Sequence, residues 1–328
     1  MESEAIEYNR DYTRRCADSV SGEMERQPRL SDESTRVYSS VLDAVFALLG
    51  EVVEILEPLG HKYVVVGGWS PYLLNNGPIP HPGTRDVDIL FAEGASPGAL
   101  RSVIKVLIDH GFLPSAKHQF QLLRVLRVAD FDLVFNVDLL HPLERFREDS
   151  SIKPDMFVDH IELAVPLSKY LADNYKGMSI ATPNSGFILE DSQFVRTPLD
   201  FDLPDGRSSR IDVPIMNEVG LIVTKSQSIS SPKRPRDAFD IYVAISQCRD
   251  YDALVSAFRE LKRQHFGAFA SLCGIAKLVD STGPFDFGLR IEEFIPEEQR
   301  DPSLHELPYA DPYAERVAEF LVDIRLDE

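Results

Sequence analysis

Two aspartates, Asp86 and Asp88, occupy alternate positions of the apolar run DVDILF. On a β-strand, residues i and i+2 point to the same face, so these carboxylates project together while Val87 and Ile89 face the core. Two neighbouring carboxylates repel each other unless a cation lies between them. Carboxylate oxygens are the ligands that Mg²⁺ takes when it binds together with substrate phosphates. The pair therefore predicts a metal site, for Mg²⁺ or Mn²⁺.

A glycine pair, Gly67 and Gly68, follows the β-branched run Tyr63–Val66 upstream of the aspartates. The run predicts a buried strand, and two glycines let the backbone turn sharply and approach a ligand closely. Ser70 before Pro71 predicts a helix start with a capping hydroxyl. Free N–H groups at a helix start favour a phosphate. We therefore expect Gly67, Gly68 and Ser70 to contact a nucleotide.

A strand, a glycine turn, a short helix and an Asp-x-Asp strand in this order resemble the nucleotidyltransferase superfamily. The motif stands here as Val66-Gly67-Gly68 and Asp86-Val87-Asp88-Ile89. The resemblance implies a third carboxylate on a later strand of the same sheet.

The run at residues 131–140 predicts such a strand, joined by a hairpin to a strand at residues 119–128. Asp132 and Asp138 share one face of it. Asp138 is the better positional match to the superfamily, and Asp132 is the alternative.

Positive charge is concentrated at Lys225, Lys233, Arg234 and Arg236. A triphosphate or an RNA backbone needs such a patch. Asp237 and Asp240 follow at i and i+3, on one face of a predicted helix. These acids either orient the lysine or the arginines, or are simply favoured by the helix dipole near a helix start.

A helix with a lysine, a basic loop and then Arg-Asp-x-x-Asp on a helix are similar to the AbiEii-type toxins of abortive-infection and toxin–antitoxin systems. The similarity extends over residues 60–245. It implies that Lys225, Arg236, Asp237 and Asp240 complete the nucleotide site. It also implies a tRNA end or a protein side chain as acceptor, and a separately encoded antitoxin as partner.

The chain has 328 residues, enough for a sizeable core and two domains. We expect an α/β fold, with a nucleotidyltransferase-like mixed sheet and flanking helices over residues 35–215. A mainly helical C-terminal domain over residues 216–328 is expected to complete the site. Residues 1–34 are predicted to be a mobile or loosely docked arm. Helices are predicted at 35–57, 97–110, 155–175, 216–228, 251–265, 266–279 and 313–325, with another opening at 237.

Composition and charge exclude several classes of protein. No apolar run is long enough to span a membrane, and the first residues lack the apolar region of a secretory signal. Cys16, Cys248 and Cys273 are scattered, which indicates reduced thiols in a cytoplasmic protein. The net charge of −19 argues against broad, non-specific binding of nucleic acid.

Together these patterns predict a metal-dependent nucleotidyltransferase. An acceptor hydroxyl would attack the α-phosphate of a nucleoside triphosphate, and pyrophosphate would leave. Asp86, Asp88 and Asp138 would hold the metal, and Lys225 would neutralise the triphosphate. Two alternatives stay open, an Asp-x-Asp glycosyltransferase and a non-catalytic nucleotide-binding regulator on the same scaffold. Trp69 is expected in the core, and His81 in a turn.

Overall fold

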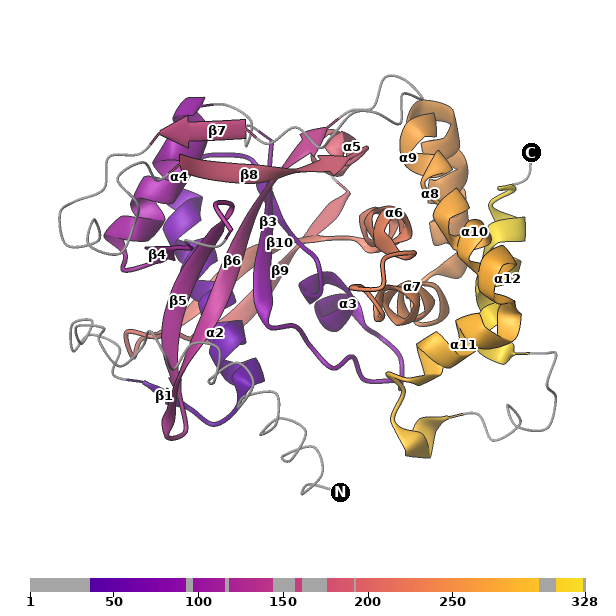
Figure 1. Cartoon of the computed structure of the whole chain (residues 1–328), viewed down its shortest axis with the longest axis horizontal. Coiled ribbons are helices and arrows are strands. Elements are labelled where there is room, and N and C mark those ends of the chain that lie inside the picture. The colour runs from indigo at the N-terminus through magenta and orange to yellow at the C-terminus, as the bar shows by residue number, and fades with distance from the viewer. Residues whose placement is uncertain are drawn as a thin grey trace.

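A mixed β-sheet forms the centre of the protein, with its strands in the order β1-β5-β6-β3-β2-β10-β9 (Figure 1). The computed structural model describes residues 36–92, 97–115, 118–143, 157–160, 176–191, 193–300 and 311–326. On the sheet, β8 pairs with β6, while β4 pairs with β5 and β7 with β8. The strands are β1 (Val37–Tyr38), β2 (Tyr63–Val66), β3 (Asp86–Phe91), β4 (Leu113–Pro114), β5 (Gln121–Val128), β6 (Phe131–Leu143), β7 (Phe157–His160), β8 (Lys176–Pro183), β9 (Phe194–Asp202) and β10 (Ser208–Met216).

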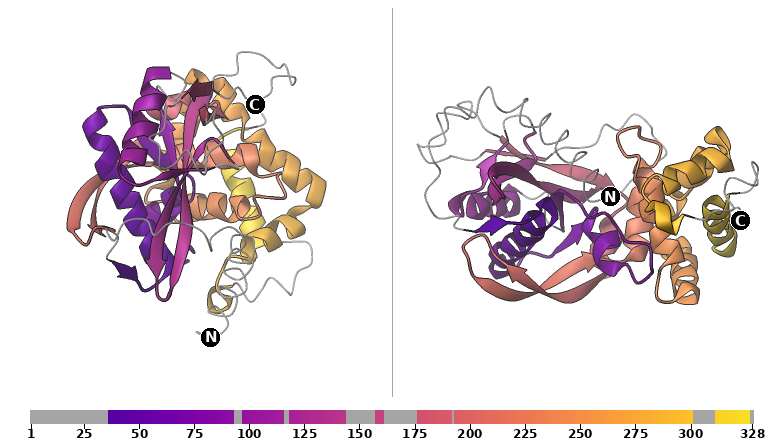
Figure 2. Two further views of the ribbon diagram at one scale, coloured as in Figure 1. Left: turned by 60° about the vertical axis from the view of Figure 1, so that its left-hand side comes forward. Right: turned by 90° about the horizontal axis from the view of Figure 1, so that it is seen from below.

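Helices flank the sheet on both faces, and the region after β10 is helical (Figures 1 and 2). In Figure 1, α6 and α7 lie next to the sheet, and α10, α11 and α12 lie farther out. The predicted α/β class with a helical C-terminal region is confirmed. The helices are α2 (Val41–Leu56), η1 (Glu57–Leu59), α3 (Trp69–Leu74), α4 (Pro97–Asp109), α5 (Gly186–Glu190), α6 (Glu218–Ser228), α7 (Asp237–Ser246), α8 (Tyr251–Gln264), α9 (Phe266–Ala270), α10 (Cys273–Thr282), α11 (Pro284–Glu292), η2 (Glu297–Gln299) and α12 (Pro312–Asp323).

The two faces of the central strands belong to two different hydrophobic cores. Val87 and Ile89 of β3 are fully buried in a core shared with α2 and α4, as their alternation with the aspartates predicts. Leu90 points the other way, into a core that it shares with the C-terminal helices. Because residues i and i+2 share a face, Asp86 and Asp88 point to the side of the sheet that carries the helical region.

Three predicted helices differ from the structure. The helix predicted from residue 35 begins at Val41, where the Ser40 hydroxyl accepts a hydrogen bond from the Asp43 N–H at 3.1 Å, and Val37–Tyr38 pairs with β5 instead. The helix predicted at 266–279 is divided into α9 and α10. Within the predicted helix 155–175, Phe157–His160 pairs as a strand with β8. The rest of that segment and the predicted arm at residues 1–34 lie outside the described residues.

In the part of the chain that the structure describes, no helix combines the length and apolar character needed to cross a membrane.

Candidate functional site

Asp88 and Asp138 are direct neighbours on the adjacent parallel strands β3 and β6. The same register places Asp86 opposite Asn136. Paired residues of neighbouring strands point to one face of a sheet, so the predicted third carboxylate lies beside the Asp-x-Asp pair. The alternative, Asp132, has a side chain that is 53% exposed and forms an ion pair with Arg127 at 3.1 Å. Asp138 is therefore the carboxylate that the sheet brings to Asp88.

The surroundings of Asp88 and Asp138 disfavour the charged form of both side chains. Burial raises the pKa of Asp88 well above its ordinary value, and the charges of Asp86 and Asp138 raise it further, against the opposing effect of Arg234. Burial also raises the pKa of Asp138, although a hydrogen bond from Asn136 at 3.3 Å opposes the rise. A cation between these side chains would relieve both effects.

The carboxylates are of the chemical type that binds a metal ion, but the described residues do not enclose one. Carboxylate oxygens on one face suit Mg²⁺. However, no three His, Cys, Asp or Glu side chains among the described residues are arranged so that they could hold a metal ion. The Thr84 hydroxyl donates to Asp86 Oδ1 at 2.5 Å, so Asp86 would have to exchange Thr84 for the ion. The three-carboxylate site stays a prediction.

The Gly67–Gly68 turn packs tightly between the carboxylates and the C-terminal helices. Gly67 has φ +70°, the left-handed region, and a Cβ built on it would overlap the carboxylate of Asp88. A Cβ on Gly68 would lie 2.7 Å from Arg236 Nη2 and from Thr84 Oγ1. The close approach that the glycines permit is thus made to Asp88 on one side and to Arg236 on the other.

Ser70 does not cap the helix, and that prediction is wrong. Gly68, with φ −71° and ψ −15°, is the N-cap and follows the left-handed Gly67, so α3 begins at Trp69. Ser70 therefore falls inside the first turn, and its side chain is fully buried. Trp69 is also fully buried, and its indole N–H donates to the Asp86 carbonyl oxygen at 2.9 Å. This agrees with its expected place in the core.

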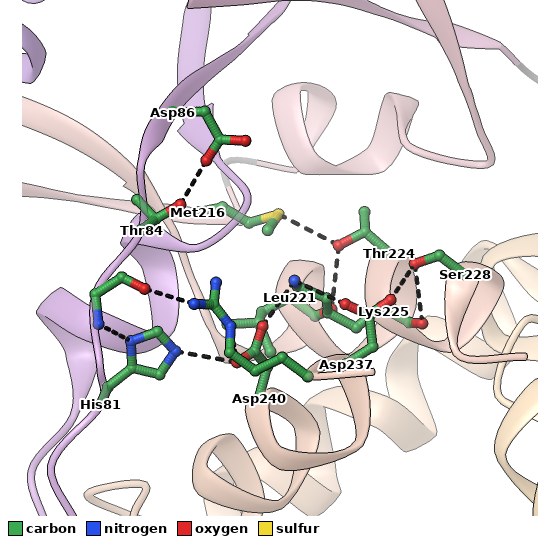
Figure 3. A network of polar contacts seen from close by, with 12 residues as sticks. His81, Thr84, Asp86, Met216, Leu221, Thr224, Lys225, Ser228, Asp237 and Asp240 are labelled. Atoms are coloured by element: carbon green, nitrogen blue, oxygen red, sulfur yellow. Dashed lines mark hydrogen bonds and ion pairs between the residues drawn. The ribbon is translucent and has the colours of Figure 1, made fainter. Parts of the chain in front are cut away.

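Lys225 lies between two carboxylates of α7. Its Nζ is 3.0 Å from Asp237 Oδ1 and 2.7 Å from Asp240 Oδ2 (Figure 3). Burial alone would lower the pKa of Lys225, but the two carboxylates outweigh it and raise the pKa above its ordinary value. Asp237 is 2% exposed and Asp240 is fully buried. The acids therefore orient the lysine, and they are not merely solvated residues at a helix start.

Sequence reasoning missed His81 and Ser228. His81 was expected in an ordinary turn, but it is buried, with Nε2 3.0 Å from Asp240 Oδ1. The Ser228 hydroxyl donates to Asp237 Oδ2 at 2.6 Å. Neither residue stands in a spacing that indicates these contacts.

A pocket of about 840 Å³ opens on the face that carries the carboxylates. Its size lies within the range of about 300–1,000 Å³ typical of small-molecule sites. Among its cations, Arg234 and Lys277 are exposed and form no ion pair with a described residue. Those two side chains are therefore available to an anionic ligand. The lining includes Gly67, Asp88, Thr182, Lys225, Arg234 and Lys277.

No protein-family model matches the chain, and no curated protein is similar to it. Similar solved structures include an antigenic nucleotidyltransferase-like protein from Paracoccidioides brasiliensis. It has 15% sequence identity and a TM-score of 0.35, over 78% of this chain and 94% of that chain. The lincosamide antibiotic adenylyltransferase LnuA, with lincomycin bound, has 17% identity and a TM-score of 0.28, over 60% of this chain and 93% of that one. Similarity at this level assigns neither a substrate nor the role of any residue.

Proposed function

We propose that the protein is a metal-dependent nucleotidyltransferase. The observation that carries the proposal is one pocket with charges of both signs. Asp88, beside Asp138, stands on its sheet side, and Lys225 and Arg234 stand on its helical side. Carboxylates of raised pKa are suited to a divalent cation, and the cations are suited to the triphosphate that such an ion accompanies.

The reaction forms a phosphate ester bond and breaks a phosphoanhydride bond. The oxygen of an acceptor hydroxyl forms a bond to the α-phosphorus of a nucleoside triphosphate, the bond from that phosphorus to the bridging oxygen breaks, and pyrophosphate leaves. Asp138, which lies beside Asp88 on the neighbouring strand, takes the proton of the hydroxyl as general base. Lys225 and Arg234 stabilise the charge on the leaving phosphates.

Asp88 and Asp138, joined by Asp86 once it releases Thr84, would hold Mg²⁺ or Mn²⁺. When bound, the ion supplies Lewis-acid stabilisation of the phosphate oxygens. Asp237 and Asp240 keep Lys225 charged and in place. Arg236 lies against Gly68, where the turn and the guanidinium together present hydrogen-bond donors to a phosphate.

Label transfer tests the proposal. The protein would be incubated with each α-³²P-labelled nucleoside triphosphate, Mg²⁺ and either total RNA or cell extract, with the Asp88→Asn variant as control. We expect label on an acceptor with the wild type alone. The similarity to AbiEii-type toxins extends the proposal to a tRNA end or a protein side chain as acceptor, and to an antitoxin partner. The RNA and protein fractions would separate the two kinds of acceptor.

A non-catalytic nucleotide-binding regulator is the second candidate. Two observations on the described residues favour it: Thr84 occupies an oxygen of Asp86, and no three acidic, His or Cys side chains are arranged to hold an ion. In that case the wild type would bind a nucleoside triphosphate at equilibrium but transfer no label to any acceptor. Equilibrium dialysis beside the label assay therefore distinguishes a binding protein from an enzyme.

A further inference from the structure

Residues 81–84 connect the two charged halves of the site. His81 contacts α7, Gly83 contacts Arg236 just before that helix, and Thr84 contacts Asp86 on β3. We propose that His81 is a positioning residue that fixes Asp240 and, through it, Lys225 and Arg236. The proposal rests on the proposed function in that these cations serve the nucleotide. The observations that support it are hydrogen bonds and ion pairs within the chain, and they do not depend on a bound nucleotide.

The hydrogen bonds of His81 define a single tautomer. The Gly83 N–H points at Nδ1 over 3.1 Å, so Nδ1 accepts and carries no proton. In the neutral ring Nε2 then holds the proton and donates it to Asp240 Oδ1 at 3.0 Å. The ring is stacked on Phe239, with centroids 5.7 Å apart, and its edge meets Tyr72. Packing and both ring nitrogens thus hold the imidazole in one orientation.

Asp240 transmits this orientation to the cations. Its Oδ1 receives His81 Nε2 and lies 3.3 Å from Arg236 Nε, while its Oδ2 lies 2.7 Å from Lys225 Nζ. Burial would raise the pKa of Asp240, but Lys225, His81 and Arg236 hold it well below its usual range. The carboxylate is fully buried, and Oδ2 makes no hydrogen bond with a described residue, so the ion pair with Lys225 is the contact that holds it. A change in the His81 contact therefore turns the group that orients Lys225.

Arg236 and Gly83 link this cluster to the segment that holds Asp86, one of the proposed metal ligands. Arg236 Nη1 donates to the Gly83 carbonyl oxygen at 2.6 Å. The next residue, Thr84, donates to Asp86. Figure 3 shows His81, Thr84 and Asp86 on one side of the network, with Lys225, Asp237 and Asp240 on the other. One short segment thus sets the spacing between the proposed metal ligands and the proposed triphosphate ligands.

Two substitutions separate positioning from packing. His81→Asn places an acceptor near Nδ1 for the Gly83 N–H but does not reach Asp240. His81→Gln places an amide N–H near Nε2 and keeps a donor to Asp240. We expect His81→Asn to raise the KM for the triphosphate about tenfold or more, the effect of one hydrogen bond to a charged group. The KM of His81→Gln should stay within about threefold of the wild-type value. The KM of the control His110→Asn should do the same, because His110 is exposed and lies just after the end of α4.

NMR gives a readout that needs neither nucleotide nor metal. In the wild type we expect ¹⁵N shifts of a neutral Nε2–H imidazole at pH 7, and a slowly exchanging Lys225 ammonium. That ammonium signal should shift or broaden in His81→Asn and persist in His81→Gln. An Nδ1–H tautomer, or an unchanged Lys225 signal in His81→Asn, would overturn the proposal even if nucleotide transfer is found. A wild type that binds no triphosphate would instead overturn the proposed function and leave the NMR result standing.

Discussion

Gly67 lies directly against the carboxylate of Asp88, so that even a methyl group at Gly67 would overlap Asp88 Oδ2. The contact joins the left-handed turn after β2 to the aspartate on β3, and the two strands are paired at Val66 and Asp88. The alternation of β3 points this carboxylate to the side of the sheet where Asp138 and the pocket lie, and the absence of a side chain at Gly67 leaves room for it there.

Gly67→Ala should therefore disturb the site as well as the backbone. Gly60→Ala is a matched control, because Gly60 has φ +67° and open space around its Cβ position. Both variants incur left-handed strain of about 1–2 kcal/mol. Gly67→Ala should lose about 1–3 kcal/mol more from overpacking, and it should lose Mg²⁺-dependent transfer while Gly60→Ala keeps it. Urea unfolding and the label assay would show both. Equal losses of stability would contradict the proposed contact.

Asp88→Asn should stabilise the protein without metal and abolish its activity. The raised pKa of Asp88 means that stability is fully present below the ordinary carboxyl pKa and is lost as pH rises through the folded pKa. At pH 7 the uncharged amide should thus raise the free energy of unfolding, as urea unfolding of the metal-free proteins would measure.

Mg²⁺ should raise the melting temperature of the wild type and not that of Asp88→Asn, because only the wild type binds the ion. Asp132→Asn, at an exposed carboxylate of the same sheet, should change stability by less than about 0.5 kcal/mol and keep the Mg²⁺ response. A Mg²⁺ response that survives in Asp88→Asn would remove Asp88 from the metal site.

Lys225→Met should be strongly destabilising, because it leaves Asp237 and Asp240 buried with less compensating charge. Breaking a buried ion pair in this way costs about 3–5 kcal/mol. Adding Asp240→Asn to Lys225→Met should recover part of that loss, since it removes one of the uncompensated charges. Urea unfolding of the single and double variants measures both effects, and a single variant as stable as the wild type would show that the pair does not stabilise the fold.

Lys277→Met is the contrasting change on the same pocket. Lys277 is exposed and forms no ion pair with a described residue, so stability should change by less than about 0.5 kcal/mol. Triphosphate binding should weaken and depend less on salt, because one cation is removed from the pocket. Equilibrium dialysis at two salt concentrations checks this. Unchanged affinity and salt dependence would place Lys277 outside the nucleotide site.

The local sequence pattern was sufficient to predict the strands that carry the carboxylates. β-Branched residues bounded by glycines located Tyr63–Val66, and period-two alternation located Asp86–Phe91 with its polar face. The hairpin of β5 and β6 follows from its short connection, and the alternation on β6 put Asp138 on the polar face. The register that joins Asp88 to Asp138 depends on strand order, which the superfamily resemblance supplied.

Contacts between distant segments lay beyond that reasoning. His81 and Asp240 are 159 residues apart, and they meet only because α7 packs against the segment before β3. Ser70 was misplaced because the positive φ of Gly67 lets the helix begin at Trp69, a backbone detail that the Ser-Pro pair does not reveal. Residues 157–160 became a strand through pairing with β8, which local composition does not encode.

Acid should destabilise the fold through His81. Burial lowers the pKa of this ring below 6.5, although the Asp240 carboxylate opposes the shift and Arg236 and Lys225 reinforce it. Tyr72 meets the ring only by its edge. Between the folded pKa and 6.5 the unfolded chain binds more protons than the folded one, so stability is fully present above about pH 6.5 and falls as pH falls below it. A proton on Nδ1 would also set the ring against the Gly83 N–H that it now accepts.

The measurement is urea unfolding of the wild type and of His81→Gln from pH 8 to pH 5. The raised pKa values of Asp88 and Asp138 change stability in the opposite direction with pH, but both proteins carry them, so the difference between the two isolates His81. We expect the stability of the wild type relative to His81→Gln to decrease as the pH falls, because glutamine does not titrate. A difference that stays constant, or that grows in favour of the wild type at low pH, would mean that the ring is not held neutral by its burial.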